Sequence, residues 1–141
     1  CCLNETRPFE EINLVLDSIN EFNIPWGIVT NKPKFYAKRI VDTFLSQYEP
    51  KFLVCPDDTG ERKPSPKGLL MACKLVEALP QNSIYVGDHL IDIQAGRLAR
   101  MITVAADYGY IPKGQRTKDW GADFTVKSPK EINLIISKVL L

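Results

Sequence analysis

The stretch IYVGDHLIDIQAGRL, residues 84–98, decides the fold of this chain. It opens with a short apolar run, passes through a polar turn and continues with apolar residues at helical spacing, Ile91, Ala95 and Leu98. The pattern predicts a buried strand followed by a helix over residues 89–100, with these three side chains facing inward. Short, continuously apolar strands are typical of parallel sheets covered by helices on both faces.

The same alternation continues outward in both directions. Strands are expected at residues 26–30, 52–55, 83–87, 102–105 and 124–126. Helices are expected at residues 8–22, 35–48, 65–79 and 89–100, with a last one that opens at residues 128–131. Residues 56–66 read as a polar loop and residues 106–123 as a turn-rich segment. The sequence therefore predicts an α/β fold, a doubly wound, Rossmann-like parallel sheet that binds ligands at the carboxyl ends of its strands.

Composition and charge exclude several classes of protein. The 141 residues suffice for one domain, and 45% of them are apolar, which excludes a disordered chain. The 18 Lys and Arg are balanced by 17 Asp and Glu, so a general nucleic-acid binder is not expected. No apolar run is long enough to span a membrane. The four cysteines form no C-x-x-C pair, which favours buried thiols in a reducing compartment. We expect a cytoplasmic protein without nucleic-acid or membrane partners.

Two acidic residues follow the expected strand at 83–87. Asp88 and Asp92 are four positions apart, a spacing that places both carboxylates on one side of the first helical turn. Two close carboxylates are costly unless a cation lies nearby, and Mg²⁺ takes one or two carboxylates together with waters and a phosphate oxygen. The alternative is structural, with Asp88 as a helix cap and Asp92 as a favourable first-turn charge.

Other polar residues follow the strands at 26–30 and 52–55. The Thr30 hydroxyl and the backbone N–H of Asn31 are candidate donors to an anionic oxygen, and Lys63 is a candidate cation for a phosphoryl group. His89 is a candidate substrate contact. Taken alone, each of these residues is more often ordinary turn or surface chemistry. Three aromatic residues either line the entrance or pack in the core, namely Tyr108, Tyr110 and Trp120.

Taken together and in this order, these segments resemble the haloacid dehalogenase (HAD) superfamily. The matching strings are IVTNKP (28–33), ERKPSP (61–66), YVGDHLIDIQAGR (85–97), VAADYGYIP (104–112) and WGAD (120–123). The chain is most similar to the phosphoglycolate phosphatase-like branch, in a subgroup that includes N-acetylmuramic acid 6-phosphate phosphatases. The resemblance covers nearly the whole chain.

The resemblance implies a Mg²⁺-dependent phosphatase that hydrolyses a small phosphorylated metabolite through an aspartyl-phosphate. Phosphoglycolate and a sugar phosphate such as N-acetylmuramic acid 6-phosphate are the implied substrates. Thr30 would then hydrogen-bond the transferring phosphoryl group, and Lys63 would neutralise it together with the nucleophile. Asp88 would bind Mg²⁺, and Asp92 would support the metal or its waters.

One part of the family pattern is absent. The D-x-D-G-T string that supplies the nucleophile and the general acid does not occur, and the nearest acidic string, at 55–60, lacks its spacing. The helical cap that selects the substrate is also absent. We therefore expect residues 1–141 to be a core fragment of a longer enzyme, inactive alone, in which residues 1–22 re-enter the core from the cap.

Two other interpretations remain at this point. A receiver domain of two-component signalling also combines acidic residues, a Thr and a Lys-Pro. There the acidic pair comes first and the Lys last, which is opposite to the order here. A non-catalytic metal- and phosphate-binding module, or a pseudo-enzyme, would fit the same residues without the missing nucleophile.

Overall fold

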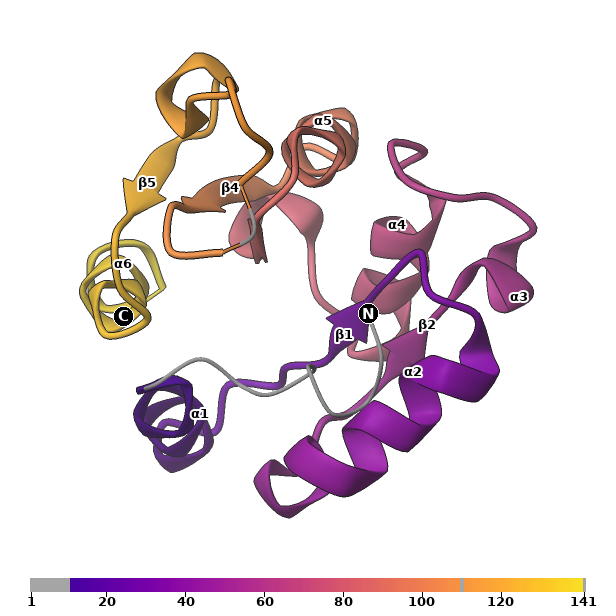
Figure 1. Cartoon of the computed structure of the whole chain (residues 1–141). Coiled ribbons are helices and arrows are strands. Elements are labelled where there is room, and N and C mark those ends of the chain that lie inside the picture. The colour runs from indigo at the N-terminus through magenta and orange to yellow at the C-terminus, as the bar shows by residue number, and fades with distance from the viewer. Residues whose placement is uncertain (1–10, 110, 141) are drawn as a thin grey trace.

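A computed structural model describes residues 11–109 and 111–140 (Figure 1). Strands and helices alternate along these residues, as predicted. The strands are β1 (Ile28–Val29), β2 (Leu53–Val54), β3 (Ile84–Gly87), β4 (Ile102–Ala106) and β5 (Phe124–Val126). The α-helices are α1 (Ile12–Glu21), α2 (Lys34–Ile40), α3 (Pro56–Thr59), α4 (Lys67–Leu75), α5 (Leu90–Leu98) and α6 (Glu131–Val139). Shorter helical turns are η1 (Val41–Leu45), η2 (Ser46–Tyr48), η3 (Pro80–Asn82) and η4 (Thr117–Asp119).

Within the described residues, the strands form two parallel ladders, β1–β2 and β3–β4–β5. The backbone N–H groups on either side of Val29 donate to carbonyls of the segment around β2. Val29 therefore turns its carbonyl to the opposite edge of β1, because successive residues of a strand point to alternate edges. The side chains of Tyr85 and Lys63 contact that carbonyl. The predicted parallel α/β class is confirmed, and the ladder is interrupted between β1 and β3.

Helices cover both sides of the strands, which is the reason for their continuous apolar character. On one side, α1 and α6 pack over β4 and β5 around the largest core cluster, formed by Val15, Val104, Val126, Ile132, Ile135 and Ile136. On the other side, a smaller cluster joins α4 and α5 through Leu69, Ala95 and Ala99. Gly96 lets α5 approach β4 closely, since a Cβ there would lie 2.5 Å from the Thr103 methyl carbon.

Two sequence predictions about local structure are wrong. The polar loop expected at 56–66 begins with the short helix α3, which the Asp58 carboxylate caps by accepting from the Cys55 N–H. Leu98 is expected from its spacing to face inward, but its side chain is 63% exposed, whereas Ile93 and Ala95 are the fully buried residues of α5. The small residues that pack against β4 set the rotation of this helix and turn Leu98 outward.

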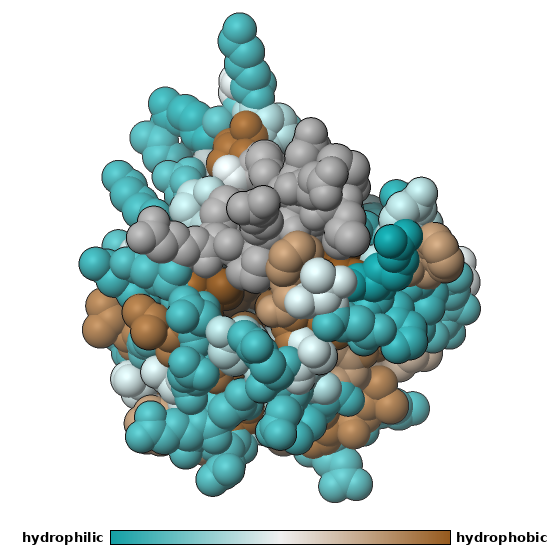
Figure 2. Space-filling model, turned by 60° about the horizontal axis from the view of Figure 1, so that its bottom comes forward, coloured by the Kyte–Doolittle hydropathy of each residue, from teal (hydrophilic) through white to brown (hydrophobic). Residues whose placement is uncertain are grey.

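The surface is mainly polar on the face shown in Figure 2, where apolar side chains appear in separate groups outside the grey atoms. In the part of the chain that the structure describes, no helix has both the length and the apolar character needed to cross a membrane. Cys55 and Cys73 are buried free thiols, as expected, whereas Cys1 and Cys2 lie outside the described residues.

Candidate active site

The candidate residues lie close together at the carboxyl ends of β1 and β3. Thr30 and Asn31 follow β1, Lys63 lies in the loop before α4, and Asp88 follows β3. The Lys63 ammonium and the Asp92 carboxylate form an ion pair, with 2.5 Å between Nζ and Oδ1 and side chains only 11% and 7% exposed. An ion pair this far from water is strongly constrained in position, because neither charge has solvent as an alternative partner.

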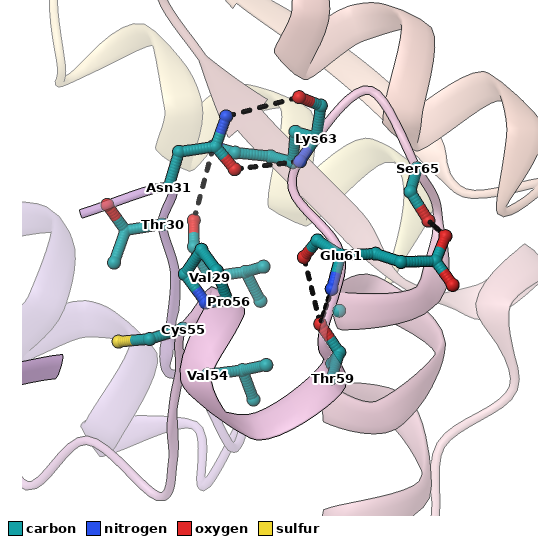
Figure 3. Close-up of a pocket in the computed structure, with 11 residues that line it drawn as sticks. Val29, Thr30, Asn31, Val54, Cys55, Pro56, Thr59, Glu61, Lys63 and Ser65 are labelled. Carbon is teal, nitrogen blue, oxygen red and sulfur yellow. Dashed lines mark hydrogen bonds between the residues drawn. The ribbon is translucent and has the colours of Figure 1, made fainter. Parts of the chain in front are cut away.

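Asn31 holds the backbone of Lys63. Its side-chain amide donates from Nδ2 to the Lys63 carbonyl at 3.1 Å, and its Oδ1 accepts from the Lys63 N–H at 2.7 Å. Figure 3 shows both bonds beside the end of β1. The structure thus gives the Asn31 side chain a positioning role that the sequence did not suggest. The proposed donation from the backbone N–H of Asn31 to an anion stays a prediction.

Thr30 lies across a shallow pocket from the Lys63 loop (Figure 3). Its N–H donates to the Val54 carbonyl at 3.0 Å, which fixes its backbone, and its Oγ1 accepts from the Lys32 N–H at 3.1 Å. A hydroxyl that accepts one bond still has its own proton to donate, so Thr30 retains the donor that binding an anionic oxygen requires. The pocket has a volume of only about 10 Å³, enough for about one water molecule.

The Lys63 ammonium has a further partner that sequence reasoning missed. The Tyr85 hydroxyl oxygen lies 2.8 Å from Nζ, and the Tyr85 ring lies beneath the same ammonium at 5.4 Å. Burial, and then the neighbouring Asp92 carboxylate, raises the pKa of Tyr85 well above its ordinary value. Its phenol is therefore neutral at neutral pH. The only signal in the sequence was a hydroxyl-bearing side chain within an otherwise apolar strand.

Both oxygens of Asp92 are used within the protein. Oδ1 accepts from Lys63, and Oδ2 accepts from the backbone N–H of His89 at 3.1 Å. His89, and not Asp88, is the N-cap of α5, and Asp92 is the reciprocating residue of its capping box. Asp92 is therefore better suited to hold Lys63 and the helix terminus than to act as a direct metal ligand.

Asp88 and His89 lie at the outer edge of the cluster. Asp88 Oδ1 is 2.5 Å from His89 Nδ1, and the His89 side chain is 52% exposed. Potential ligand atoms of Asp88, His89 and Asp92 lie within 4.8 Å of one another. A carboxylate at a partly exposed position suits Mg²⁺, which binds few protein oxygens and keeps several waters. Asp88 fits this requirement best, because its side chain is 24% exposed, whereas the Asp92 side chain is only 7% exposed and both of its oxygens accept protein donors.

The segment after β4 covers Asp88. A Cβ on Gly109 would overlap the Asp88 side chain, including its Oδ2 at 2.5 Å, so only glycine lets this backbone lie so close. Burial, and secondarily the Asp88 charge, raises the pKa of Tyr108 to about 12. Trp120 packs in the core with Ile93 and Ala105, which makes it a packing residue. Tyr110 lies outside the described residues.

Comparisons with known proteins concern the family and the fold of the chain. The family described as haloacid dehalogenase-like hydrolase matches residues 3–106. The chain is 37% identical over 139 residues to an N-acetylmuramic acid 6-phosphate phosphatase of Pseudomonas putida, covering 99% of this chain and 62% of the relative. It is 36% identical over 124 residues to a phosphoglycolate phosphatase of Xylella fastidiosa, covering 88% of this chain and 54% of that protein. The chain thus spans under two thirds of the length of these relatives.

Solved structures share the fold. A predicted phosphoglycolate phosphatase from Haemophilus somnus superposes with a TM-score of 0.84 at 22% identity, covering 92% of this chain and 57% of the other. A HAD family hydrolase from Deinococcus radiodurans, solved with bound phosphate and sodium, has a TM-score of 0.87 at 16% identity and covers 97% and 62%. At these identities the likeness concerns the fold alone.

Proposed function

The chain belongs to the haloacid dehalogenase-like hydrolases, and from this premise we propose that it is the larger part of the catalytic core of a phosphatase for small phosphomonoesters. The observation that carries the proposal is the position of the Lys63 ammonium. It lies between the Thr30 side of the site and the acidic cluster, in a nearly buried ion pair with Asp92. A fixed positive charge between a hydroxyl donor and a carboxylate suits a phosphoryl group beside a cation.

Each residue has a proposed role in this reaction. The Thr30 hydroxyl donates to a phosphoryl oxygen, while the Lys63 ammonium offsets the negative charge shared by the phosphoryl group and the nucleophile. Asp88 would hold Mg²⁺, which would supply charge neutralisation at the phosphoryl oxygens. Asp92 keeps Lys63 and the start of α5 in place, and His89 faces the substrate from the exposed rim. The reaction proceeds through an aspartyl-phosphate.

We propose that the nucleophile is carried by a segment outside residues 1–141. We propose that an upstream strand carrying D-x-D-G-T lies between β1 and β3, and that residues 1–22 lead back from a cap domain. The outward carbonyl of Val29 supports this position, because only side chains of Tyr85 and Lys63 reach it among the described residues. A strand there would join the two ladders into one parallel sheet.

The relatives support a proposal for the substrate class. Their names support phosphoglycolate or N-acetylmuramic acid 6-phosphate, both small phosphomonoesters, as candidate substrates. We propose a cytoplasmic site of action, since the two buried cysteines of the described residues carry free thiols, as is usual in reducing compartments. No nucleic-acid or membrane partner is proposed.

A comparison of two proteins tests the proposal. With Mg²⁺, the complete protein, including its upstream segment, should hydrolyse an aryl phosphate. It should hydrolyse one of the two candidate substrates much faster than this aryl phosphate. Residues 1–141 alone should be inactive. Asp88→Asn in the complete protein should abolish Mg²⁺-dependent turnover and leave the thermal unfolding temperature nearly unchanged.

Two outcomes would count against this function. An inactive complete protein that still binds Mg²⁺ and phosphate would favour a non-catalytic binding module. Labelling of the chain by acetyl phosphate would favour a receiver domain. Unchanged kinetics in Asp88→Asn would remove Asp88 from the site.

A further inference from the structure

The acidic string at 55–60, which the proposed reaction does not use, binds the first residue of α2. Asp57 Oδ1 accepts from the Lys34 N–H at 3.0 Å, and Asp58 Oδ2 accepts from Lys34 Nζ at 2.7 Å. The same ammonium donates to the Leu53 carbonyl at 2.9 Å. Both α2 and α3 pack against β2 (Figure 1). Lys34 is therefore fastened to β2 and α3 through its main chain and through its side chain.

The bond from Asp57 gives α2 an N-cap that its own N-cap residue does not provide. That residue is Pro33, and its side chain makes no capping hydrogen bond. The first N–H groups of a helix have no partner within the helix, and a capping oxygen normally accepts from one of them. A negative charge is also favourable at a helix N-terminus. Asp57 thus caps α2 from a position 23 residues away in the chain.

The segment between β1 and α2 carries the proposed phosphoryl donor, Thr30. At the start of this segment, the Thr30 N–H donates to the Val54 carbonyl at 3.0 Å. At its end, Lys34 is held by α3. Between these two points, the Lys32 N–H donates to Thr30 Oγ1 at 3.1 Å, which leaves the hydroxyl proton to point elsewhere. The direction of the Thr30 hydroxyl therefore depends on how both ends of the segment are fixed.

The contacts of Lys34 lie on the β2 side of β1, away from the open edge that faces β3. The carbonyls on either side of Leu53 accept from the segment around β1. The Leu53 carbonyl itself points to the outer edge of β2, because successive residues of a strand alternate, and there it accepts from Lys34. The strand proposed between β1 and β3 would lie on the opposite side of β1, so it would leave the bonds from Asp57 and Asp58 unchanged.

We propose that Asp57 is a positioning residue for Thr30, because by capping α2 it fixes the end of the segment whose main chain orients the Thr30 hydroxyl. The inference rests on the proposed function, in which this hydroxyl donates to the phosphoryl group. Asp57 does not line the pocket between Thr30 and the Lys63 loop, so it acts on the reaction only through the segment. The role requires an acceptor oxygen, which asparagine also provides at an N-cap.

Asp57→Ala in the complete protein tests this proposal, at a temperature far below the unfolding transition of every variant. We expect kcat to fall about threefold or more, since small displacements of a positioned group cost large factors in rate. Asp57→Asn should stay within about twofold of the unaltered protein, because Asn and Asp cap helices about equally well. Asp119→Ala is the matched control, since Asp119 is an exposed acid that pairs with Arg116 beside η4. Unchanged kcat in Asp57→Ala, or an equal loss in Asp57→Asn or in Asp119→Ala, would overturn the proposal.

Hydrogen exchange, followed by nuclear magnetic resonance, separates this inference from the proposed function. In Asp57→Ala the Lys34 N–H should exchange about fivefold faster, the scale of a lost N-cap, and the Lys32 N–H should exchange faster with it. Asp119→Ala should leave both rates unchanged. A complete protein without phosphatase activity would end the proposed function, yet these rates would still decide whether the cap reaches Thr30. Faster exchange at Lys34 with an unchanged rate at Lys32 would overturn the inference.

Discussion

The side-chain amide of Asn31 and the peptide group of Lys63 hydrogen-bond each other in both directions, at 3.1 Å and 2.7 Å. The two residues are 32 positions apart, so this pair fastens the loop before α4 to the carboxyl end of β1. The side chain of Lys63 starts from a backbone that is fixed on both sides of its Cα atom. The backbone freedom of Lys63 is therefore already lost, and only its side-chain torsions remain to be ordered when the ammonium pairs with Asp92.

Asn31→Ala should destabilise the protein by about 1–3 kcal/mol, because it leaves two partly buried backbone groups of Lys63 without partners. Asn31→Asp keeps the acceptor for the Lys63 N–H but turns a carboxylate oxygen toward the Lys63 carbonyl, so it should also destabilise the protein. Urea denaturation measures both, with Asn82→Ala on the exposed turn η3 as the control. A change in Asn31→Ala of less than about 0.5 kcal/mol, typical of surface substitutions, would contradict this role.

The sequence predicted the strand and helix order because that information is local. Each short apolar run and each amphipathic segment carries its own period, and the parallel pairing of β3 with β4 follows from their connection through α5. The location of the candidate residues after successive strands followed from the rule that ligands bind at the carboxyl ends of parallel strands, whereas the ion pair between Lys63 and Asp92 was not predicted. These expectations needed no knowledge of particular side-chain contacts.

The parts that the sequence did not predict depend on contacts between distant segments. The Tyr85 hydroxyl meets the Val29 carbonyl across 56 positions, and nothing within β3 indicates that pairing. The break between the ladders β1–β2 and β3–β4–β5 likewise depends on which strands hydrogen-bond with each other. The rotation of α5, which exposes Leu98, is set by the close packing of Gly96 on Thr103. Packing between elements overrides the apolar period of a single helix.

The ion pair between Lys63 and Asp92 should behave as a unit. Lys63→Met and Asp92→Asn should each destabilise the protein by about 3–5 kcal/mol, since each leaves the other charge nearly buried without its partner. The double variant should lose clearly less than the sum of the two, by about 1–3 kcal/mol. Chemical denaturation of the unaltered protein, the two single variants and the double variant measures these free energies of unfolding. Additive losses would mean that the two charges do not stabilise each other.

Asp58 should make stability depend on pH in the acid range. Its hydrogen bond from Lys34, and next that from the Cys55 N–H, lowers the pKa of Asp58 below its ordinary value. A carboxyl whose pKa is lower in the folded state stabilises the fold above its unfolded pKa, and this contribution is lost as the pH falls through the folded pKa.

The unaltered protein should therefore exceed Asp58→Asn in stability at neutral pH, by no more than about 1 kcal/mol because the pair is partly exposed. The difference should vanish once the pH has fallen well below about 3.9, the ordinary pKa of Asp. Urea denaturation between pH 7 and about pH 2.5 measures the difference in stability above and below the ordinary pKa of Asp. Lys34→Met, which removes the main cause, should reduce the difference, and a difference that stays constant with pH would refute the assignment.

Gly109 should control the geometry of Asp88. A side chain at this position would overlap the Asp88 side chain near its base, where rotation cannot relieve the clash, so the carboxylate or the segment after β4 must move. If Asp88 is the metal ligand, Gly109→Ala should weaken the binding of Mn²⁺, used as a paramagnetic substitute for Mg²⁺, by about tenfold or more. Electron paramagnetic resonance measures free and bound Mn²⁺ directly and does not require turnover.

Gly114→Ala is the control, because Gly114 has φ +86° and open space around it. That control should lower stability by about 1–2 kcal/mol through backbone strain and leave Mn²⁺ affinity unchanged. Equal affinities in Gly109→Ala and the unaltered protein would show that the close contact with Asp88 has no part in metal binding.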